Sequence, residues 1–204
     1  HRDLHSFPTR RSSDLLAVAN NYNDKSYSID SKIYRWDGSS FVEFQSLATN
    51  GAHGWEAFTL DGGHYLVVAN SYNGASHSTD SKIYRWDGSV FAEFQALATH
   101  GALGWKAFAI DGTQYLAVAN NYNDASYNID SKIYRWDGSS FAEFQTWATN
   151  GAWCWEAFTI DDTQYLAVAN YYSDSIIYTL TITTTTISTS FTTSTSTSST
   201  SLTS

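Results

Sequence analysis

The stretch Trp105–Gln145, WKAFAIDGTQYLAVANNYNDASYNIDSKIYRWDGSSFAEFQ, contains one complete unit of a repeat that organises the whole chain. The same phrases recur about fifty residues away in both directions, so that Tyr65, Tyr115 and Tyr165 each begin a closely similar segment. Self-similarity at a fixed period of this length is typical of a fold built from stacked copies of one small unit. What one unit forms, and how many units are present, therefore decide the architecture.

The unit contains four short segments with the composition of β-strands. Trp105–Ile110 and Tyr115–Asn120 lie on either side of an Asp-Gly turn, which is typical of an antiparallel hairpin. Ser131–Trp136 and Phe141–Gln145 flank a second Asp-Gly turn in the same way. All four segments are rich in β-branched and aromatic residues and lack proline. Each unit is therefore predicted to form a four-stranded antiparallel sheet.

The connections between these strands differ in length. Asp-Gly turns join the first strand to the second and the third to the fourth, whereas the second and third strands are joined by the polar segment 121–130. The fourth strand is expected to reach the next unit through a second long loop, residues 148–154. Since antiparallel strands alternate in direction, the tight turns are predicted at one edge of the sheet and the long loops at the other. Long loops on a rigid scaffold commonly carry binding sites.

Four-stranded units that recur at this period are typical of a β-propeller, in which each blade packs its faces against its neighbours. A β-solenoid is the main alternative, but its coils are usually shorter and lack two hairpins per unit. The copies span about 16–54, 55–104, 105–154 and 155–180, which corresponds to about 3.3 repeats. The predicted fold class is therefore all-β, a partial β-propeller.

The two ends of the chain do not match the repeat. Residues 1–15 contain the only proline, Pro8, and resemble a translated sequencing adapter, so we expect an artefact or a disordered arm. Residues 181–204 are almost entirely Thr and Ser, a composition that buries too little apolar surface to order the backbone. We expect a Ser/Thr-rich disordered tail there.

Charge and cysteine content narrow the classes of partner. Residues 16–180 contain 8 basic and 18 acidic side chains, a net charge of −10. Nucleic acids and anionic membrane surfaces require a basic footprint, so neither is an expected partner. No apolar run approaches the roughly 20 residues that span a bilayer, and no signal peptide is visible. The single cysteine, Cys154, excludes a disulfide framework and a thiolate zinc site.

Four phrases recur in register through the copies: YLAVANNYN, SKIYRWDGSSF, FQ-LAT-GA and WEAF. Together they resemble the EAR, or epitempin (EPTP), repeat, over essentially all of residues 16–178. Leucine-rich glioma-inactivated proteins and thrombospondin-type laminin G domain and EAR repeat proteins belong to that family. The resemblance implies a seven-bladed propeller that is secreted or displayed at the cell surface and binds other proteins without acting as an enzyme.

The number of copies departs from that family pattern. Seven blades cannot be built from about 3.3 repeats, so we expect an arc that is a fragment of a longer protein and whose open sheet edges invite pairing. The expected partners are an extracellular or cell-surface protein and the missing blades of the same parent chain.

Two groups of side chains are candidates for binding a partner, one in the long loops and one at matching positions of the first strand, which would line the propeller channel. The candidates are Asn23, Asp24, Asp30, Asn73, Asp80, Asn123, Asp124 and Asp130 in the loops, and Glu56, Lys106 and Glu156 on the strands. Oxygen ligands of this kind suit Ca²⁺, but their spacing is not that of a tight calcium loop, and Gly74 replaces one carboxylate. Hydrogen bonds to the backbone of the loop explain these Asn and Asp residues better. We expect no metal site, no cofactor and no catalytic residue.

Two other functional classes stay open. A lectin-like propeller that binds carbohydrate would need an exposed Trp or Tyr beside Asn or Asp at the same place in each blade. A propeller glycosidase or lyase would need paired carboxylates or a histidine-containing site facing the channel. At matching channel positions the repeat supplies only the unlike trio Glu56, Lys106 and Glu156. The tryptophans Trp55, Trp105 and Trp155 are expected to fill the space between blades.

Overall fold

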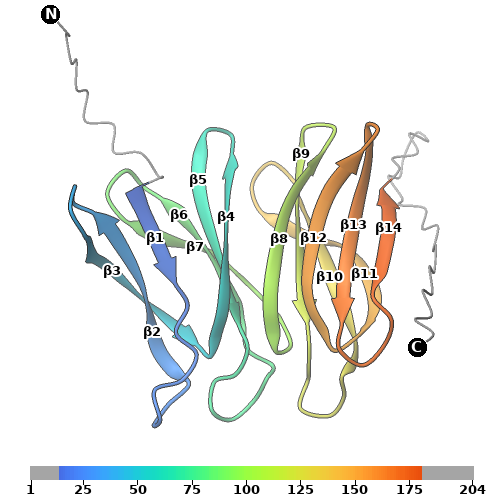
Figure 1. Ribbon diagram of the computed structural model, residues 1–204, viewed down its shortest axis with the longest axis horizontal. Coiled ribbons are helices and arrows are strands. Elements are labelled where there is room, and N and C mark those ends of the chain that lie inside the picture. Colours follow the sequence, from blue (N-terminus) through green and yellow to red (C-terminus); the bar gives the residue numbers. More distant parts are fainter. Residues whose placement is uncertain (1–13, 181–204) are drawn as a thin grey trace, which may run out of the picture.

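The computed structural model describes residues 14–180, which form four antiparallel β-sheets placed side by side (Figure 1). The expected adapter-like segment, apart from its last two residues, and the expected Ser/Thr-rich tail lie outside the described residues. The strands are β1 (Leu15–Val18), β2 (Ser28–Trp36), β3 (Phe41–Asn50), β4 (Ala52–Leu60), β5 (Gly63–Asn70), β6 (Ser81–Trp86), β7 (Phe91–Leu97), β8 (Ala102–Ile110), β9 (Thr113–Asn120), β10 (Asn128–Trp136), β11 (Phe141–Asn150), β12 (Ala152–Ile160), β13 (Thr163–Asn170) and β14 (Ile176–Leu180). The predicted class, an all-β partial β-propeller, is confirmed.

Each sheet is one blade, and its strands follow one another in chain order. Blade 1 contains β1 to β3, blade 2 contains β4 to β7, blade 3 contains β8 to β11, and blade 4 contains β12 to β14. The turns β4–β5, β8–β9 and β12–β13 gather at one end of the blades, and the longer loops β1–β2, β5–β6 and β9–β10 gather at the other (Figure 1). We call these two ends the turn edge and the loop edge. No helix long and apolar enough to cross a membrane occurs between residues 14 and 180.

The Asp-Gly turns form as the sequence predicts. In the β2–β3 turn the Asp37 carboxylate accepts backbone N–H bonds from Ser39 at 2.8 Å and from Ser40 at 2.9 Å. These bonds lower the pKa of Asp37 to about 2. The Trp-Asp-Gly phrase is therefore a strand end followed by a side-chain-stabilised turn.

The prediction of a long loop between the fourth strand of one unit and the first strand of the next is wrong. Only Gly51 separates β3 from β4, and only Gly151 separates β11 from β12, whereas residues 98–101 separate β7 from β8. The hairpin is longer than predicted because residues 28–30 pair with residues 48–50. Gly51 has a φ of 52°, and a Cβ there would lie 2.7 Å from the backbone oxygen of Tyr72, so this tight junction requires glycine.

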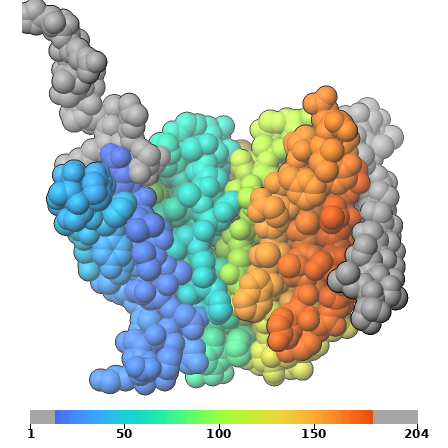
Figure 2. Space-filling model, viewed as in Figure 1, coloured from blue at the N-terminus to red at the C-terminus, as the bar shows by residue number. Residues whose placement is uncertain are grey.

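The hydrophobic core lies between the blades, which form adjoining slabs in the space-filling view (Figure 2). The cluster between blades 2 and 3 joins Val67 and Ile83 of one blade to Leu116, Val118 and Phe141 of the next. In the central strands β5 and β9, every residue from the tyrosine to the final asparagine is buried. Burying both faces of a sheet in this way requires neighbours on both sides, as in other stacked repeats.

Polar side chains join the blades at fixed points. The Gln45 amide donates to the Phe91 carbonyl at 2.8 Å and accepts from the Phe91 N–H at 2.9 Å, and Gln95 repeats both bonds with Phe141. The Trp105 indole N–H donates to the Val68 carbonyl at 3.0 Å. Trp155 makes the same bond to Val118 at 2.9 Å. The prediction that these tryptophans fill the space between blades is confirmed.

Replacement of Trp105 with Phe should lower the free energy of unfolding by about 1–2 kcal/mol, because the buried indole bond to Val68 is lost. Trp55→Phe is the matched control, since the Trp55 Nε1 is buried without a hydrogen-bond partner among the described residues. Urea denaturation of both variants measures the difference. If both variants lose the same free energy of unfolding, ring packing and not the hydrogen bond holds these blades together.

Candidate functional site

The three charged residues predicted to line the channel lie on neighbouring inner strands. Glu56 is on β4, Lys106 on β8 and Glu156 on β12, and β8 contacts both β4 and β12 directly. Lys106 forms an ion pair with Glu156 at 2.8 Å, and Glu56 accepts the backbone N–H of Ala107 at 3.1 Å. The bond to Glu156 raises the pKa of Lys106. These side chains therefore join adjacent blades to one another.

The loop asparagines hold the backbone of their own loops. The Asn73 side-chain oxygen accepts the N–H groups of Ala75 and Ser76, both at 2.9 Å. Asn23 and Asn123 make the equivalent bonds in blades 1 and 3. Within residues 14–180 no group of three or more His, Cys, Asp or Glu side chains is arranged to hold a metal ion. The loop geometry thus explains the recurring asparagine without a cation.

The residue after this asparagine has a left-handed backbone in each loop. Asp24 has a φ of 66°, Gly74 a φ of 95° and Asp124 a φ of 72°. Gly74 therefore lacks the carboxylate of the other two loops, but glycine adopts this left-handed backbone conformation without strain.

Asp124 reaches across to blade 2. Its carboxylate accepts the Ser76 hydroxyl at 2.5 Å and the His77 backbone N–H at 2.9 Å, and it lies 2.6 Å from His77 Nδ1. These bonds lower the pKa of Asp124 far below its ordinary value, the Ser76 hydroxyl contributing most. Asp24 has no such contact with another described residue.

An aspartate at the end of the long loop recurs once in every blade, and its side chain stays exposed. The backbone carbonyls of Asp30, Asp80 and Asp130 accept side-chain N–H bonds from Asn20, Asn70 and Asn120 at 2.8–2.9 Å. Asp174 accepts the same bond from Asn170 in blade 4, at 2.9 Å. All four aspartates are exposed, and their carboxylates make no hydrogen bond to another described side chain or backbone group.

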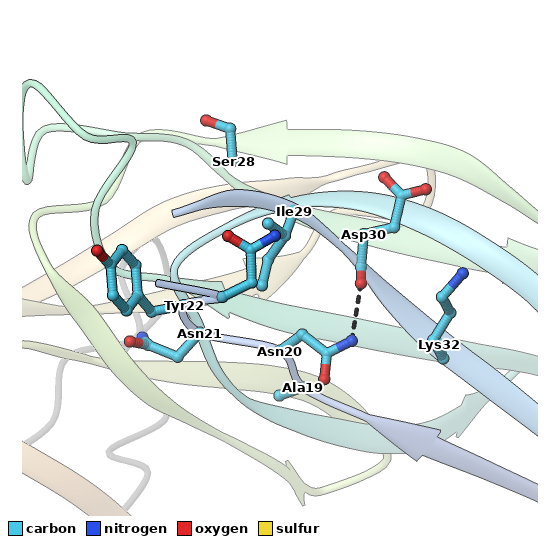
Figure 3. A pocket seen from close by; sticks show the side chains of 9 residues that line it. Ala19, Asn20, Asn21, Tyr22, Ser28, Ile29, Asp30 and Lys32 are labelled. Carbon is cyan, nitrogen blue, oxygen red and sulfur yellow. Dashed lines mark hydrogen bonds between the residues drawn. The ribbon is translucent and has the colours of Figure 1, made fainter. Parts of the chain in front are cut away.

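Blade 1 shows this arrangement beside an open hollow of about 780 Å³ (Figure 3). Asn20 and Asp30 are joined by their hydrogen bond, and the Asp30 carboxylate points away from that bond. Tyr22 and Lys32 line the same hollow. The loop edge therefore presents a carboxylate and an aromatic ring within one depression.

The asparagine that ends the second strand of blades 2 and 3 is the centre of a buried network. Asn120 is fully buried, and its amide accepts the His100 N–H at 3.0 Å while donating to the Asp130 carbonyl at 2.9 Å. Its backbone N–H donates to the Ser131 hydroxyl, which is in turn bonded to Thr149. This one side chain joins the β7–β8 connection, which contains His100, to β10 of blade 3, which contains Asp130.

A row of aromatic rings, which the sequence reasoning missed, runs along the loop edge through all four blades. Neighbouring ring centroids lie 4.4 to 4.9 Å apart, and contacts within a loop alternate with contacts between blades. We call this row the aromatic strip. It consists of Tyr22, Tyr27, Tyr72, His77, Tyr122, Tyr127 and Tyr172.

The aromatic strip is partly open to solvent. Tyr22 is 49% exposed, Tyr127 39% and Tyr172 51%. The signal that could have revealed it is the return of tyrosine at positions 22, 72, 122 and 172, directly before the loop asparagine in the first three copies. Tyrosines with one exposed edge present both apolar surface and a hydroxyl, which suits recognition of another molecule.

Comparison with known families matches this chain to the EPTP domain over residues 40–87, 90–137 and 140–179. Each of the first two matches begins before the outer strand of one blade and ends with or just after the third strand of the next. The family unit therefore spans the boundary between blades.

Two curated proteins share part of this repeat. The thrombospondin-type laminin G domain and EAR repeat-containing protein of Homo sapiens is 45% identical over 53 residues, which is 26% of this chain and 8% of that protein. The protein of the same description from Mus musculus is 43% identical over 53 residues, with the same coverage. The match thus spans less than a tenth of the length of either relative.

Among solved structures, the chain is similar to an alpha-L-arabinofuranosidase from Lactobacillus brevis. The TM-score is 0.52 at 12% sequence identity, and the match covers 80% of this chain and 66% of that one. At this identity the similarity concerns the fold alone.

Removal of the Asn120 side chain should destabilise the protein by about 2–4 kcal/mol, because the His100 N–H and the Asp130 carbonyl both lose their partner. Asn123→Ala removes only bonds within an exposed loop and should cost about 1 kcal/mol or less. Chemical denaturation of the two variants makes the comparison. A loss below 1 kcal/mol in Asn120→Ala would contradict its central role.

Asp124→Asn should make the protein less stable at pH 7 and less sensitive to acid. A carboxylate whose pKa is lowered by folding contributes stability that is present above its unfolded value, near 3.8, and is lost as the pH falls below it. The difference in thermal midpoint between wild type and variant should therefore narrow as the pH falls below about 4.

The matched control for this pH series is Asp24→Asn, which changes the same loop position where no contact between blades is made. Its thermal midpoint should follow that of the wild type at every pH. A gap between Asp124→Asn and wild type that stays constant down to strong acid would contradict the assignment.

Proposed function

Because this chain belongs to the EPTP domain family, we propose that it is a non-enzymatic, extracellular or cell-surface module that binds another protein through its loop edge. The observation that carries the proposal is the aromatic strip, a continuous row of partly exposed rings that crosses every blade. Tyrosine is enriched in protein interfaces because it buries a large apolar area at a small cost in conformational entropy. The family resemblance supports the placement outside the cell.

The loop edge is favoured over the inner strands for a physical reason. Lys106 and Glu156 are paired with each other, and Glu56 is bonded to the backbone of the next blade. A partner would have to break those contacts to use these charges. The rings and the exposed carboxylates of the loop edge need no such rearrangement, so they form the proposed binding surface.

Carbohydrate binding is the second candidate, and one observation favours it. An exposed or half-exposed tyrosine stands directly before the loop asparagine in blades 1, 2 and 3, as in Tyr22-Asn23 and Tyr72-Asn73. Sugar rings stack on aromatic faces and bond to amide groups. The asparagine oxygens, however, are occupied by the loop backbone, which leaves only the amide N–H groups for a sugar.

A glycosidase or lyase activity has less support. The similarity to an arabinofuranosidase rests on 12% identity and concerns the fold. Paired carboxylates separated by about 5–10 Å are the usual requirement for such chemistry. The inner strands instead place a lysine between Glu56 and Glu156, and its ion pair with Glu156 favours a structural role.

The test is binding of the purified chain to an array of extracellular proteins and to an array of glycans. We expect the chain to bind proteins of the array. We expect the variant Tyr22→Ser/Tyr127→Ser/Tyr172→Ser to bind the same proteins at least tenfold more weakly. The matched control, Trp36→Ser/Val42→Ser/Ile160→Ser, removes three similarly exposed apolar side chains from the turn edge and should retain binding. Hits confined to glycans would replace the first candidate with the second, and equal losses in both variants would refute the use of the loop edge.

A further inference from the structure

We propose that the loop edge recognises an arginine- and lysine-rich segment of its protein partner, whose cationic groups lie over the aromatic strip and beside the exposed carboxylates. This inference rests on the proposed function and specifies the chemistry of the partner. It follows from the distribution of rings, acids and cations over the two edges of the blades.

The turn edge shows how this protein combines cations with rings. Arg35 places its guanidinium carbon 3.5 Å from the centroid of Phe44, Arg85 lies 5.7 Å from Tyr65, and Arg135 lies 5.9 Å from Phe144. These are all the arginines in residues 14–180. The guanidinium groups of the described chain are therefore held over rings near the turn edge, in contacts that cation–π attraction favours.

The loop edge has rings but no arginine or lysine over them. None of the cation–ring contacts found within residues 14–180 involves the aromatic strip. Lys32, Lys82 and Lys132 start from nearby strands but are paired with glutamates of the adjacent outer strands at 2.8–2.9 Å. The exposed parts of Tyr22, Tyr127 and Tyr172 are therefore open to a cation supplied from outside.

The charge of the loop edge favours such a cation. Asp30, Asp80, Asp130 and Asp174 recur once per blade with exposed carboxylates, and Asp24 adds another. Lys25 is the one lysine or arginine in the four loops that join the second and third strands of the blades. Anionic groups such as phosphates or sulfates would be repelled here, whereas Arg and Lys side chains gain both an ion pair and a ring contact.

The spacing of the acids argues for a segment with several positive charges. Asp30, Asp80, Asp130 and Asp174 belong to four different blades, and no three acidic groups among the described residues come close enough to share one ion. A single metal cation therefore could not use them together. A peptide with repeated cationic side chains, lying across the blades, could pair with one aspartate at each step.

The experiment uses a fluorescein-labelled peptide of alternating arginine and glycine, with a glutamine–glycine peptide as the neutral probe. Fluorescence anisotropy at low ionic strength should show the arginine peptide binding the full chain at least tenfold more tightly. Its affinity should fall steeply with added salt, because exposed charges are screened. Equal binding of the two peptides would overturn the proposal.

Two charge-matched variants locate the site. Asp30→Asn/Asp80→Asn/Asp130→Asn removes three charges from the loop edge and should weaken the arginine peptide at least tenfold. Asp61→Asn/Asp111→Asn/Asp161→Asn removes three charges from the turn edge, at positions where asparagine tolerates the positive φ, and should change affinity less than twofold. Equal losses would mean that net charge alone attracts the peptide, which would overturn the proposal.

The rings are tested by comparing arginine and lysine peptides. Guanidinium stacks on aromatic faces better than ammonium does, so the wild type should prefer arginine and the variant Tyr22→Ser/Tyr127→Ser/Tyr172→Ser should lose that preference. If the variant still binds the arginine peptide more tightly than the lysine peptide, the proposed role of the strip is wrong. Protein partners found on the array that bind the loop-edge Asp→Asn variant as tightly as the wild type would refute the cationic partner and leave the proposed function intact.

Discussion

The hydrogen bonds of one asparagine in each blade, fully buried in blades 2 and 3, hold the loop edge together. In blade 2, Asn70 accepts the Asn50 N–H from the end of the preceding blade and donates to the Asp80 carbonyl at the far end of its own loop. The same side chain thus fixes where one blade meets the next and where the loop returns to the sheet. A buried amide with all these groups satisfied is stable, whereas a shifted neighbour would leave them unpaired at a cost of about 1–3 kcal/mol each. The rings and acids of the loop edge depend on this arrangement for their positions.

The core between blades and the proposed surface are two consequences of the same stacking. Apolar residues of β5 and β9 fill both faces of the middle blades, so a blade is stable only against its neighbours. At the loop edge the same stacking brings tyrosines of successive blades into contact, as between Tyr27 and Tyr72 at 4.8 Å. The rings of the strip pack against one another, and an aromatic surface held in place by packing loses little entropy on binding. The stacking that stabilises the blades therefore also forms a surface suited to recognition of another molecule.

The repeat also contains differences that have local effects. Between blades 2 and 3, His77 stands where the loops of blades 1 and 3 have Tyr27 and Tyr127, and it meets the carboxylate of Asp124 at 2.6 Å. Between blades 1 and 2 the position of that aspartate is occupied by Gly74, so no carboxylate joins the two loops there, although Tyr27 still packs against Tyr72. The boundaries between blades are therefore not equivalent, and the middle one carries an additional polar connection.

The sequence by itself determined the fold of each blade, because strand alternation and Asp-Gly turns are local signals that act within a few residues. It also determined that Trp105 and Trp155 lie between blades and that the loop asparagines bond to their own backbone. It failed at the junction of β3 and β4, where cross-strand pairing of residues 28–30 turned an expected loop into strand. Only the tertiary structure decided that seven rings from separate loops meet in one row, and that the Asp30 carboxylate stays exposed while that of Asp124 is bonded. Those contacts join residues of different blades, and the stacking of the sheets sets their distances. No local sequence pattern specifies that stacking.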